Sequence, residues 1–334
     1  MVSLQGILTT YKITRNFWTA IFIKFSNKKK TIVFKNGVAL ELTWTEFCTL
    51  RNFAAENQRK GMDFFNGCNI QRRNDKFVVE AENYKVSGLF LIITEMLNEY
   101  LPFQKLMLKG YHIKQAQEGN LFNIQKGQEL QFVGSLSILT ILMELEEGIY
   151  EFELKDKVVL DIGGFQGETA VYFARQEARK VIVYEPIPSN CKLILQNLNL
   201  NQITNVELHA AGVGDHDGVE TVRYNKIDPS FGCTNAGSKE ISFNVKNIAD
   251  VLNESDADIA KIDCEGAERH LINVRDEILK TINYYMIETH QKWIKDALTI
   301  KFMQIGYKLI KEKKLSQDID MIYLLKNEKA GIQK

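Results

Sequence analysis

The sequence predicts an α/β protein: a doubly wound, mostly parallel sheet with a terminal antiparallel hairpin, preceded by a smaller N-terminal α+β domain. The first observation is that, after Lys157, short runs rich in Val and Ile alternate with helical segments, an order that builds βαβ units and a parallel sheet. The second is a glycine-rich turn directly after the first of these runs. The third is the short turn between the last two runs, which makes them pair antiparallel.

Length and composition are those of a globular protein with about two domains. The chain has 334 residues, of which 45% are apolar and 25% charged. We expect an accessory domain over residues 1–104 and the main domain over residues 105–334. The five cysteines are widely spaced and form no C-x-x-C pair. This spacing predicts neither a disulfide framework nor a zinc knuckle, and it favours a reducing, cytoplasmic setting.

The first domain mixes helical and strand patterns. Asn36-Gly37 lies between two strand-like runs and predicts a β-hairpin. Helical periodicity follows over residues 44–60, and residues 88–103 predict a second, buried helix. We find no catalytic spacing in this domain.

The N-terminal segment is basic although the whole chain has a net charge of zero. Residues 1–60 hold ten Lys and Arg against three acids, a surplus of seven positive charges. Such a segment suits a membrane surface or another polyanion, whereas zero net charge gives no bulk attraction to nucleic acid. The apolar run over residues 17–25 is too short to span a bilayer. An interfacial helix is one alternative for this segment, and packing against its own domain is the one we favour.

The main domain is predicted to begin with hairpin-like strands and a helix, before strands and helices alternate. The predicted strands cover residues 111–116, 121–125, 130–134, 158–162, 180–186, 205–212, 219–225, 240–245, 258–263, 284–290, 307–313 and 320–326. Two predicted helices cover residues 137–147 and 248–252. Four further helices are predicted between the strands, and they end at residues 176, 200, 279 and 303. Ligands bind beside the carboxyl ends of such parallel strands.

The glycine turn has the order D-x-G-G-x-x-G from Asp161 to Gly167. Glu185, 18 positions after Gly167, can accept hydrogen bonds from a ribose and so indicates a nucleoside-containing cofactor. A dinucleotide would need G-x-G-x-x-G and a site for its pyrophosphate, whereas here the bulky Phe165 and the negative Asp161 disfavour one. A carboxylate at this turn suits a cationic ligand, so the pattern favours S-adenosylmethionine.

Longer motifs then resemble the FkbM family of S-adenosylmethionine-dependent methyltransferases. They are the glycine turn, E-P-x-P-x-N from Glu185, N-L-x-L-N from Asn197 and K-I-D-x-E-G-A-E from Lys261. The resemblance covers about residues 125 to 325. It implies a class I methyltransferase fold that acts mostly on hydroxyls of sugars, polyketides or other secondary products. Phe165 stands where the family usually has a smaller polar residue.

The resemblance also implies a cofactor site at the strand ends. Gly163, Gly164, Gln166 and Gly167 are expected to line the methionine part, Glu185 the ribose, and Ala211 and Gly212 the adenine edge. Asp161, Pro186 and Tyr150 complete the predicted site. Tyr150 has two alternatives, covering the cofactor or packing between helix and sheet.

Acids gather at the ends of the fourth and fifth strands of the alternating segment. Asp263, Glu265, Glu288 and His290 can supply a general base, a divalent-metal site or carboxylates that bind sugar hydroxyls. We name Asp263, Glu265 and His290 as catalytic and assign no metal ligand. Glu268 is expected to favour a helix N-terminus. The polar stretch Asp228 to Gly237 is a candidate acceptor-binding loop.

The predicted function is therefore transfer of a methyl group from S-adenosylmethionine to a hydroxyl of a small molecule or glycan. A tRNA methyltransferase is one alternative, although the chain lacks an N-P-P-Y-like motif. A nicotinamide-dependent oxidoreductase is another, and a cofactor-binding module without transfer activity is a third. The sequence leaves the oligomeric state open.

Overall fold

The computed structural model describes residues 4–25, 28–74, 76–89, 93–116, 121–224, 239–316 and 319–327. They divide into two compact units. Residues 1–128 with 134–143 make up the N-terminal unit, and residues 129–133 with 144–334 make up the C-terminal unit. The predicted boundary after residue 104 stays a prediction, because compactness does not test whether a segment folds on its own.

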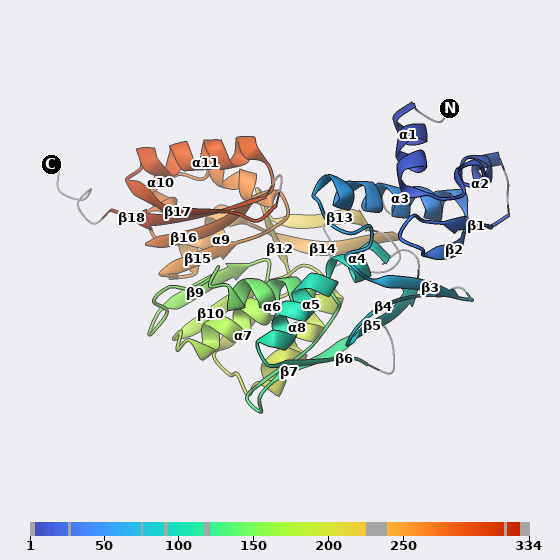
Figure 1. The fold of residues 1–334 in the computed structure, drawn as a ribbon. Helices are drawn as coiled ribbons and strands as arrows, with labels where there is room; N and C mark the ends of the chain where they lie inside the picture. Colours follow the sequence, from blue (N-terminus) through green and yellow to red (C-terminus); the bar gives the residue numbers. More distant parts are fainter. Residues whose placement is uncertain are drawn as a thin grey trace. The chain divides into compact units, whose positions relative to one another are not determined.

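The N-terminal unit combines short helices with small antiparallel sheets (Figure 1). Its helices are α1 (Leu4–Ile13), α2 (Phe17–Phe22), the 3-10 helix η1 (Ile23–Phe25), α3 (Trp44–Arg59), α4 (Ile93–Asn98) and α5 (Tyr100–Leu108). Its strands are β1 (Lys30–Val33), β2 (Ala39–Leu42), β3 (Asn69–Arg73), β4 (Lys76–Ala81), β5 (Tyr84–Leu89), β6 (Tyr111–Gln115) and β7 (Phe122–Lys126). None of the helices in the described residues is long and apolar enough to cross a membrane.

Two sequence predictions for this unit are confirmed and one is wrong in detail. β1 and β2 pair antiparallel around Asn36-Gly37, and α3 begins with a capping box between Thr43 and Glu46. The predicted helix over residues 88–103 is instead the end of β5 followed by α4 and α5. Pro102 explains why a new helix, α5, begins after α4, since proline is tolerated in the first turn of a helix and not in its interior. The meander of β3, β4 and β5 was not predicted.

The C-terminal unit is built around a seven-stranded sheet. Its strands are β9 (Val158–Ile162), β10 (Lys180–Tyr184), β11 (Val206–His209), β15 (Ile259–Ile262), β16 (Tyr284–Thr289), β17 (Tyr307–Lys314) and β18 (Asp320–Lys326). The spatial order is β11-β10-β9-β15-β16-β18-β17, and the pairs are parallel except for β16 with β18 and β17 with β18. The strand order reverses at β9, which is therefore the topological switch point of the sheet.

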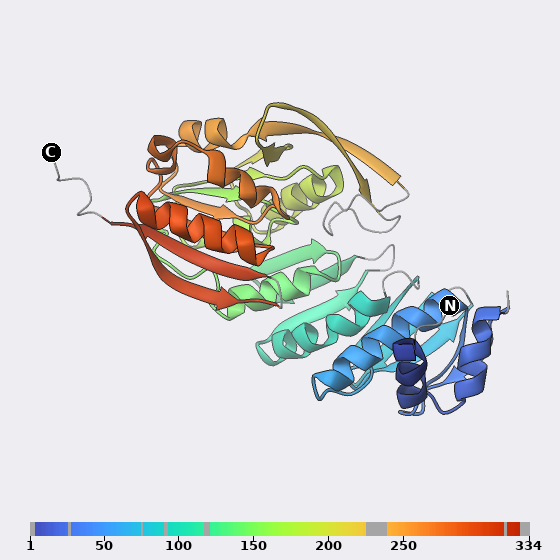
Figure 2. The ribbon, with the colours of Figure 1, turned by 90° about the horizontal axis from the view of Figure 1, so that it is seen from above.

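Helices cover both faces of this sheet. Figure 1 shows α7 (Glu168–Arg175) and α8 (Pro188–Leu200) on one face, and α10 (Asp276–Leu279) and α11 (Lys292–Gln304) on the other. The view from above in Figure 2 places α11 along β17 and β18. The helix expected to end at residue 279 is wrong in type: it is the 3-10 helix η3 (Ala267–Asn273) followed by the short α10.

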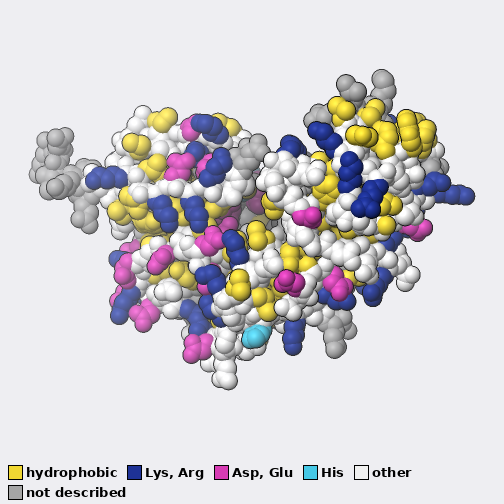
Figure 3. Space-filling view, in the orientation of Figure 1, with side chains coloured by type: hydrophobic (Ala, Val, Ile, Leu, Met, Phe, Trp, Pro, Cys, Tyr) yellow, Lys and Arg dark blue, Asp and Glu magenta, His cyan; other side chains and the backbone are white. Residues whose placement is uncertain are grey.

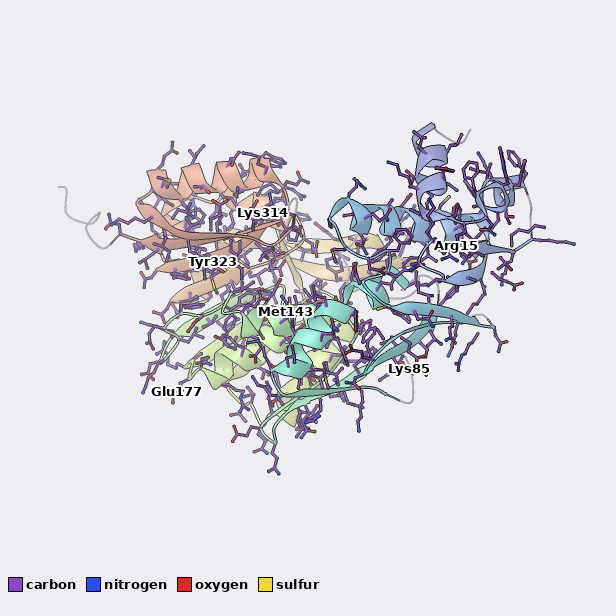
Figure 4. The ribbon with its side chains drawn as sticks, viewed as in Figure 1. Arg15, Lys85, Met143, Glu177, Lys314 and Tyr323 are labelled. Carbon is purple, nitrogen blue, oxygen red and sulfur yellow. The ribbon has the colours of Figure 1, made fainter. Side chains whose placement is uncertain are left out.

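The remaining elements are not part of the seven-stranded sheet. β12 (Gly212–Gly214), β13 (Gly218–Tyr224) and β14 (Lys239–Asn247) make a three-stranded sheet, which α9 (Ile248–Glu254) follows. β8 (Leu130–Gly134) and α6 (Ile138–Glu146) precede β9 in the chain. The segment before β9 is anchored to β18, where the buried hydroxyl of Tyr323 (Figure 4) donates to the Ile149 carbonyl at 2.6 Å. The stretch Asp228 to Gly237 lies outside the described residues.

Candidate active site

The glycine turn after β9 is folded tightly against the neighbouring strands. The amides of Gly163 and Gly164 both donate to the Tyr184 carbonyl at the end of β10, at 2.9 and 3.1 Å. Gly163 has a φ of +84°, and a Cβ built on it would lie 1.7 Å from the Asp263 carbonyl oxygen. A Cβ on Gly164 would lie 2.2 Å from a Val183 methyl group. These glycines therefore let the turn contact the ends of β10 and β15 directly.

Asp161 lies beneath this turn and its carboxylate is bound inside the protein. Its side chain is fully buried, Thr169 Oγ1 donates to Oδ2 at 2.6 Å, and Lys261 Nζ lies 3.1 Å from Oδ1. This geometry does not match the expectation that Asp161 offers its charge to a cationic ligand, because Lys261 neutralises that charge. Direct contact between Asp161 and a cofactor stays a prediction.

Lys261, on β15, connects three parts of the site. Besides Asp161, its Nζ donates to the Gly163 carbonyl at 2.6 Å and lies 3.8 Å from Asp263 Oδ2. Burial alone lowers the pKa of this ammonium, but the surrounding carboxylates raise it above its ordinary value. Lys261 is therefore a charged positioning residue for the turn, and it is not among the site residues predicted from the sequence.

Glu185 binds the other side of the turn from the end of β10. Its carboxylate accepts hydrogen bonds from the amides of Phe165 and Ile187, at 3.0 and 2.9 Å, and from Asn190 Nδ2 at 3.1 Å. Burial raises the pKa of this carboxyl to about 7, and the three donors oppose that rise. Phe165 adopts a φ of +44° at this point. Since a carboxylate offers about four acceptor positions, one is left for a ligand hydroxyl.

A second group of residues lies where β15 and β16 end. His290 Nε2 lies 3.8 Å from Asp263 Oδ1, 3.5 Å from Glu265 Oε2 and 3.6 Å from Glu288 Oε1. We call Asp263, Glu265, Glu288 and His290 the acid–histidine cluster. Asp263, Glu288 and His290 each offer a ligand atom, all within 4.8 Å of one another, so these three could hold a divalent cation.

Glu268 fixes the position of His290. Its side chain is fully buried, and its Oε1 is bound by the His290 amide at 3.0 Å and lies 3.2 Å from His290 Nδ1. Its Oε2 accepts from the Gly266 amide at 2.6 Å. Burial lowers the pKa of His290, but Glu268 and then Asp263 outweigh it and raise that pKa to about 9. Besides the helix-start role expected for it, Glu268 thus orients the His290 ring so that Nε2 faces the other three members of the cluster.

Comparison with known proteins identifies the family of the domain that holds these residues. Residues 161–326 match the family model described as the methyltransferase FkbM domain. These residues form an FkbM methyltransferase domain. The match begins at Asp161 and ends with β18, so it contains the glycine turn and the acid–histidine cluster. The predicted family and enzyme class are confirmed for this domain.

A curated relative and several solved structures also resemble the chain. "Methyltransferase 1" of Beauveria bassiana is 23% identical over 148 residues, which cover 36% of this chain and 59% of the relative. The chain therefore matches less than two thirds of that relative's length. A putative tRNA (m1A22) methyltransferase of Streptococcus pneumoniae is 11% identical, with 55% of this chain and 70% of that chain covered and a TM-score of 0.36. A ribosomal protein L11 methylase of Lactobacillus delbrueckii is 13% identical, with 59% and 82% covered and a TM-score of 0.33.

Tyr150 and Glu144 lie beside the cluster of the FkbM domain. The Tyr150 ring is buried and packs edge-on against Phe173 at 6.3 Å, while its hydroxyl lies 3.4 Å from Glu144 Oε2. Burial and the nearby Asp263 raise the pKa of Glu144 to about 7. Burial, with Asp263 and Glu144 as further causes, raises that of Glu288 to about 9. The structure therefore gives Tyr150 the packing contact, and the cofactor contact stays a prediction.

The remaining predicted residues line the same sheet edge. Gln166 is buried, and its carbonyl accepts from Asn197 Nδ2 at 2.7 Å. Ala211 is buried, and a Cβ on Gly212 would lie 3.0 Å from the Phe243 ring and 3.6 Å from Pro186. A cavity of about 790 Å³ lies at the opposite sheet edge, lined among others by Lys157, Ile259 and Tyr284 where their strands begin. It is separate from the glycine turn and the acid–histidine cluster.

Proposed function

We propose that this methyltransferase binds S-adenosylmethionine at the glycine turn and transfers its methyl group to a hydroxyl of a sugar, glycan or other secondary metabolite. The observation that carries the proposal is the direct contact between two parts of the site. Gly163, in the turn, packs against the Asp263 backbone, and Asp263 belongs to the acid–histidine cluster. A ligand at the turn and an acceptor at the cluster would therefore be neighbours, as group transfer requires.

The charge of the site fits this cofactor. Carboxyl groups around the turn and the cluster outnumber the cations, which are Lys261 and His290 among the described residues of the site. Such a site favours a sulfonium and an ammonium and disfavours the pyrophosphate of a dinucleotide. Gly163, Gly164, Gln166 and Gly167 would hold the methionine part, Glu185 and Pro186 the ribose side, and Ala211 and Gly212 the adenine edge. When bound, S-adenosylmethionine supplies an electrophilic methyl group on a positively charged sulfur.

Within the cluster, Asp263 and His290 would have different roles in the reaction. Asp263, whose side chain is 22% exposed, would accept the proton of the acceptor hydroxyl. His290 would hold its positive charge near neutral pH because its pKa is raised to about 9, so it suits orienting carboxylates and acceptor oxygens better than taking a proton. Glu265, whose side chain is 59% exposed, would bind a further hydroxyl of a sugar.

The acceptor and the setting belong to the same proposal. We expect a small-molecule or glycan acceptor and no nucleic acid. We also expect a reducing, cytoplasmic setting, since the cysteines among the described residues, Cys48, Cys68, Cys191 and Cys264, are all free thiols.

Calorimetric titration tests the cofactor. We expect micromolar binding of S-adenosylmethionine and S-adenosylhomocysteine and none of NADH. Glu185→Ala should weaken binding at least tenfold, because it removes the acceptor for the Phe165 amide as well as for a ribose hydroxyl. The matched control is Glu177→Ala, whose side chain is 69% exposed and pairs with Lys155. Preferential binding of NADH would overturn the proposal.

Transfer of a radiolabelled methyl group then tests the acceptor, with glycans, polyketides and tRNA offered in parallel. Asp263→Asn should lower kcat by about 100-fold or more while leaving the Kd of S-adenosylmethionine within a few-fold. Dialysis against EDTA followed by Mg²⁺ addition tests whether Asp263, Glu288 and His290 act through a cation. Methylation of tRNA alone would contradict the hydroxyl proposal and leave the cofactor assignment intact.

A further inference from the structure

Helices α1, α2 and η1 carry a row of exposed apolar side chains on the N-terminal unit. The exposed fractions are 54% for Leu8, 63% for Tyr11, 68% for Trp18, 59% for Phe22 and 76% for Phe25. Figure 3 shows hydrophobic side chains gathered over α1 and α2. We call these five side chains the apolar row.

The apolar row is not needed to hold the helices on their unit. The opposite faces of the same segments bury Ile13, Ala20 and Ile23, each at most 1% exposed. The segment thus packs against its own unit, as the sequence favoured, and presents a second apolar side outward. Contiguous exposed apolar surface of this kind usually marks an interaction site.

Three aromatic rings of the row, those of Tyr11, Trp18 and Phe22, are linked by ring contacts. Phe17 bridges Tyr11 and Trp18, with ring centroids 5.8 and 5.1 Å away, and Trp18 stacks on Phe22 at 6.1 Å. Tyr and Trp are the side chains that settle at the boundary between lipid and water, because each has an apolar ring and a polar atom.

The segment that carries the row is basic and has no acids of its own. Residues 1–40 contain no Asp or Glu, and they contain Lys12, Arg15, Lys24, Lys28, Lys29, Lys30 and Lys35. Lys35 Nζ lies 5.1 Å from the centre of the Tyr11 ring, and the Arg15 guanidinium (Figure 4) donates to the Lys35 carbonyl. Cations flanking an apolar row are complementary to a surface with negative headgroups over an apolar interior.

We propose that the apolar row and its flanking cations bind the surface of an anionic lipid bilayer. The helices are too short to span the bilayer, so the protein would lie on it with Trp18, Phe22 and Phe25 inserted among the headgroups. A second copy of the chain is disfavoured as the occupant, because a twofold contact through this row would bring two acid-free basic segments together. Nucleic acid is also disfavoured as the occupant, because its phosphates would pair with the cations but would leave the aliphatic Leu8 without a contact. The proposal does not depend on the proposed function.

Sedimentation of the full-length protein with vesicles tests this proposal. We expect binding to phosphatidylcholine vesicles that contain about 30% phosphatidylglycerol, little binding to phosphatidylcholine alone, and weakening as salt is raised. The variant Trp18→Ser/Phe22→Ser/Phe25→Ser should bind at least tenfold more weakly. Replacing Lys28, Lys29 and Lys30 by Gln should weaken binding by about 100-fold, from the usual attraction of each basic side chain to anionic lipid.

The matched control is Trp293→Ser, which removes another exposed indole (54% exposed, against 68% for Trp18) from the C-terminal unit and should bind vesicles like the wild type. Circular dichroism checks that each variant is folded. Equal loss of binding in the control, equal binding to neutral and anionic vesicles, or no vesicle binding would overturn the proposal. So would a dimer in sedimentation velocity that the triple serine variant dissolves, or displacement of vesicle-bound protein by a short RNA.

Discussion

Replacing Lys261 by Met tests the central electrostatic contact of the site. Lys261 and Asp161 have side chains 2% and 0% exposed, and their charged atoms lie 3.1 Å apart. Met has a similar length and no charge, so Lys261→Met leaves the Asp161 carboxylate buried with Thr169 Oγ1 as its remaining close partner. The Gly163 carbonyl loses its donor as well.

The expected cost follows from burial. Removing one partner of a buried ion pair lowers the free energy of unfolding by about 3–5 kcal/mol, because the other charge stays buried. For a unit of roughly 200 residues this corresponds to a fall in melting temperature of about 6–20 °C. Urea unfolding followed by circular dichroism measures the free energy, and differential scanning calorimetry measures the melting temperature.

A double-mutant cycle separates the pair from the packing of the lysine stem. Asp161→Asn in the Lys261→Met background should recover most of the loss, since the buried charge is gone while Thr169 keeps a hydrogen-bond partner. The control is Lys180→Met, which breaks the ion pair with Glu207 at 45% and 48% exposure and should cost about 1 kcal/mol or less. A loss below about 1 kcal/mol for Lys261→Met, or additivity within about 0.5 kcal/mol in the cycle, would refute the reasoning.

Three further substitutions test single features of the site. Gly163→Ala should abolish cofactor binding or soluble expression, because its Cβ would lie 1.7 Å from the Asp263 carbonyl; Gly37→Ala, also at positive φ but with open space around it, is the control in calorimetric titration. Burial raises the pKa of Glu168 to about 8, so the folded state favours the protonated carboxyl, and stability should fall as pH rises from about 4.5 to about 8. Glu168→Gln should flatten this fall in urea titrations at pH 5, 7 and 9, with at most about 5 kcal/mol between the two proteins at pH 9; a parallel fall in both would contradict it. Glu268→Gln should move the pKa of His290 down from about 9, as read from the ring protons by NMR, and an unchanged titration would show that other carboxylates hold the charge.

The strands of the sheet could be predicted from the sequence because each buried parallel strand is a short apolar run that ends at a polar residue. Asp161, Glu185 and Asp263 were placed correctly at strand ends for this reason. The buried ion pair of Lys261 could have been predicted, because a lysine inside an apolar strand is buried and needs a partner of opposite charge. Its partner follows from the register, since Lys261 pairs with Asp161 across β9 and β15.

That register could not be predicted, because it depends on which strands are neighbours in space. β9 and β15 are adjacent in the sheet although β10 and β11 come between them in the chain. The same limit applies to Glu268 and His290, which lie 22 positions apart and meet through the ends of two strands. Local patterns therefore place residues on elements, whereas contacts between elements require the assembled sheet.

The stretch from Lys261 to Glu268 explains how one motif organises both halves of the site. Lys261 and Asp263 lie two positions apart at the end of β15, so their side chains share a face and both approach the glycine turn. The chain then reverses through Glu265 and Gly266, with φ of +51° and +99°, which directs Glu268 toward the end of β16. Lys261 thus fixes the cofactor turn, Glu268 fixes His290, and Asp263 lies between them. Substitution of either Lys261 or Glu268 should alter the geometry at Asp263. Cofactor affinity and the titration of His290 are therefore expected to change together in each variant.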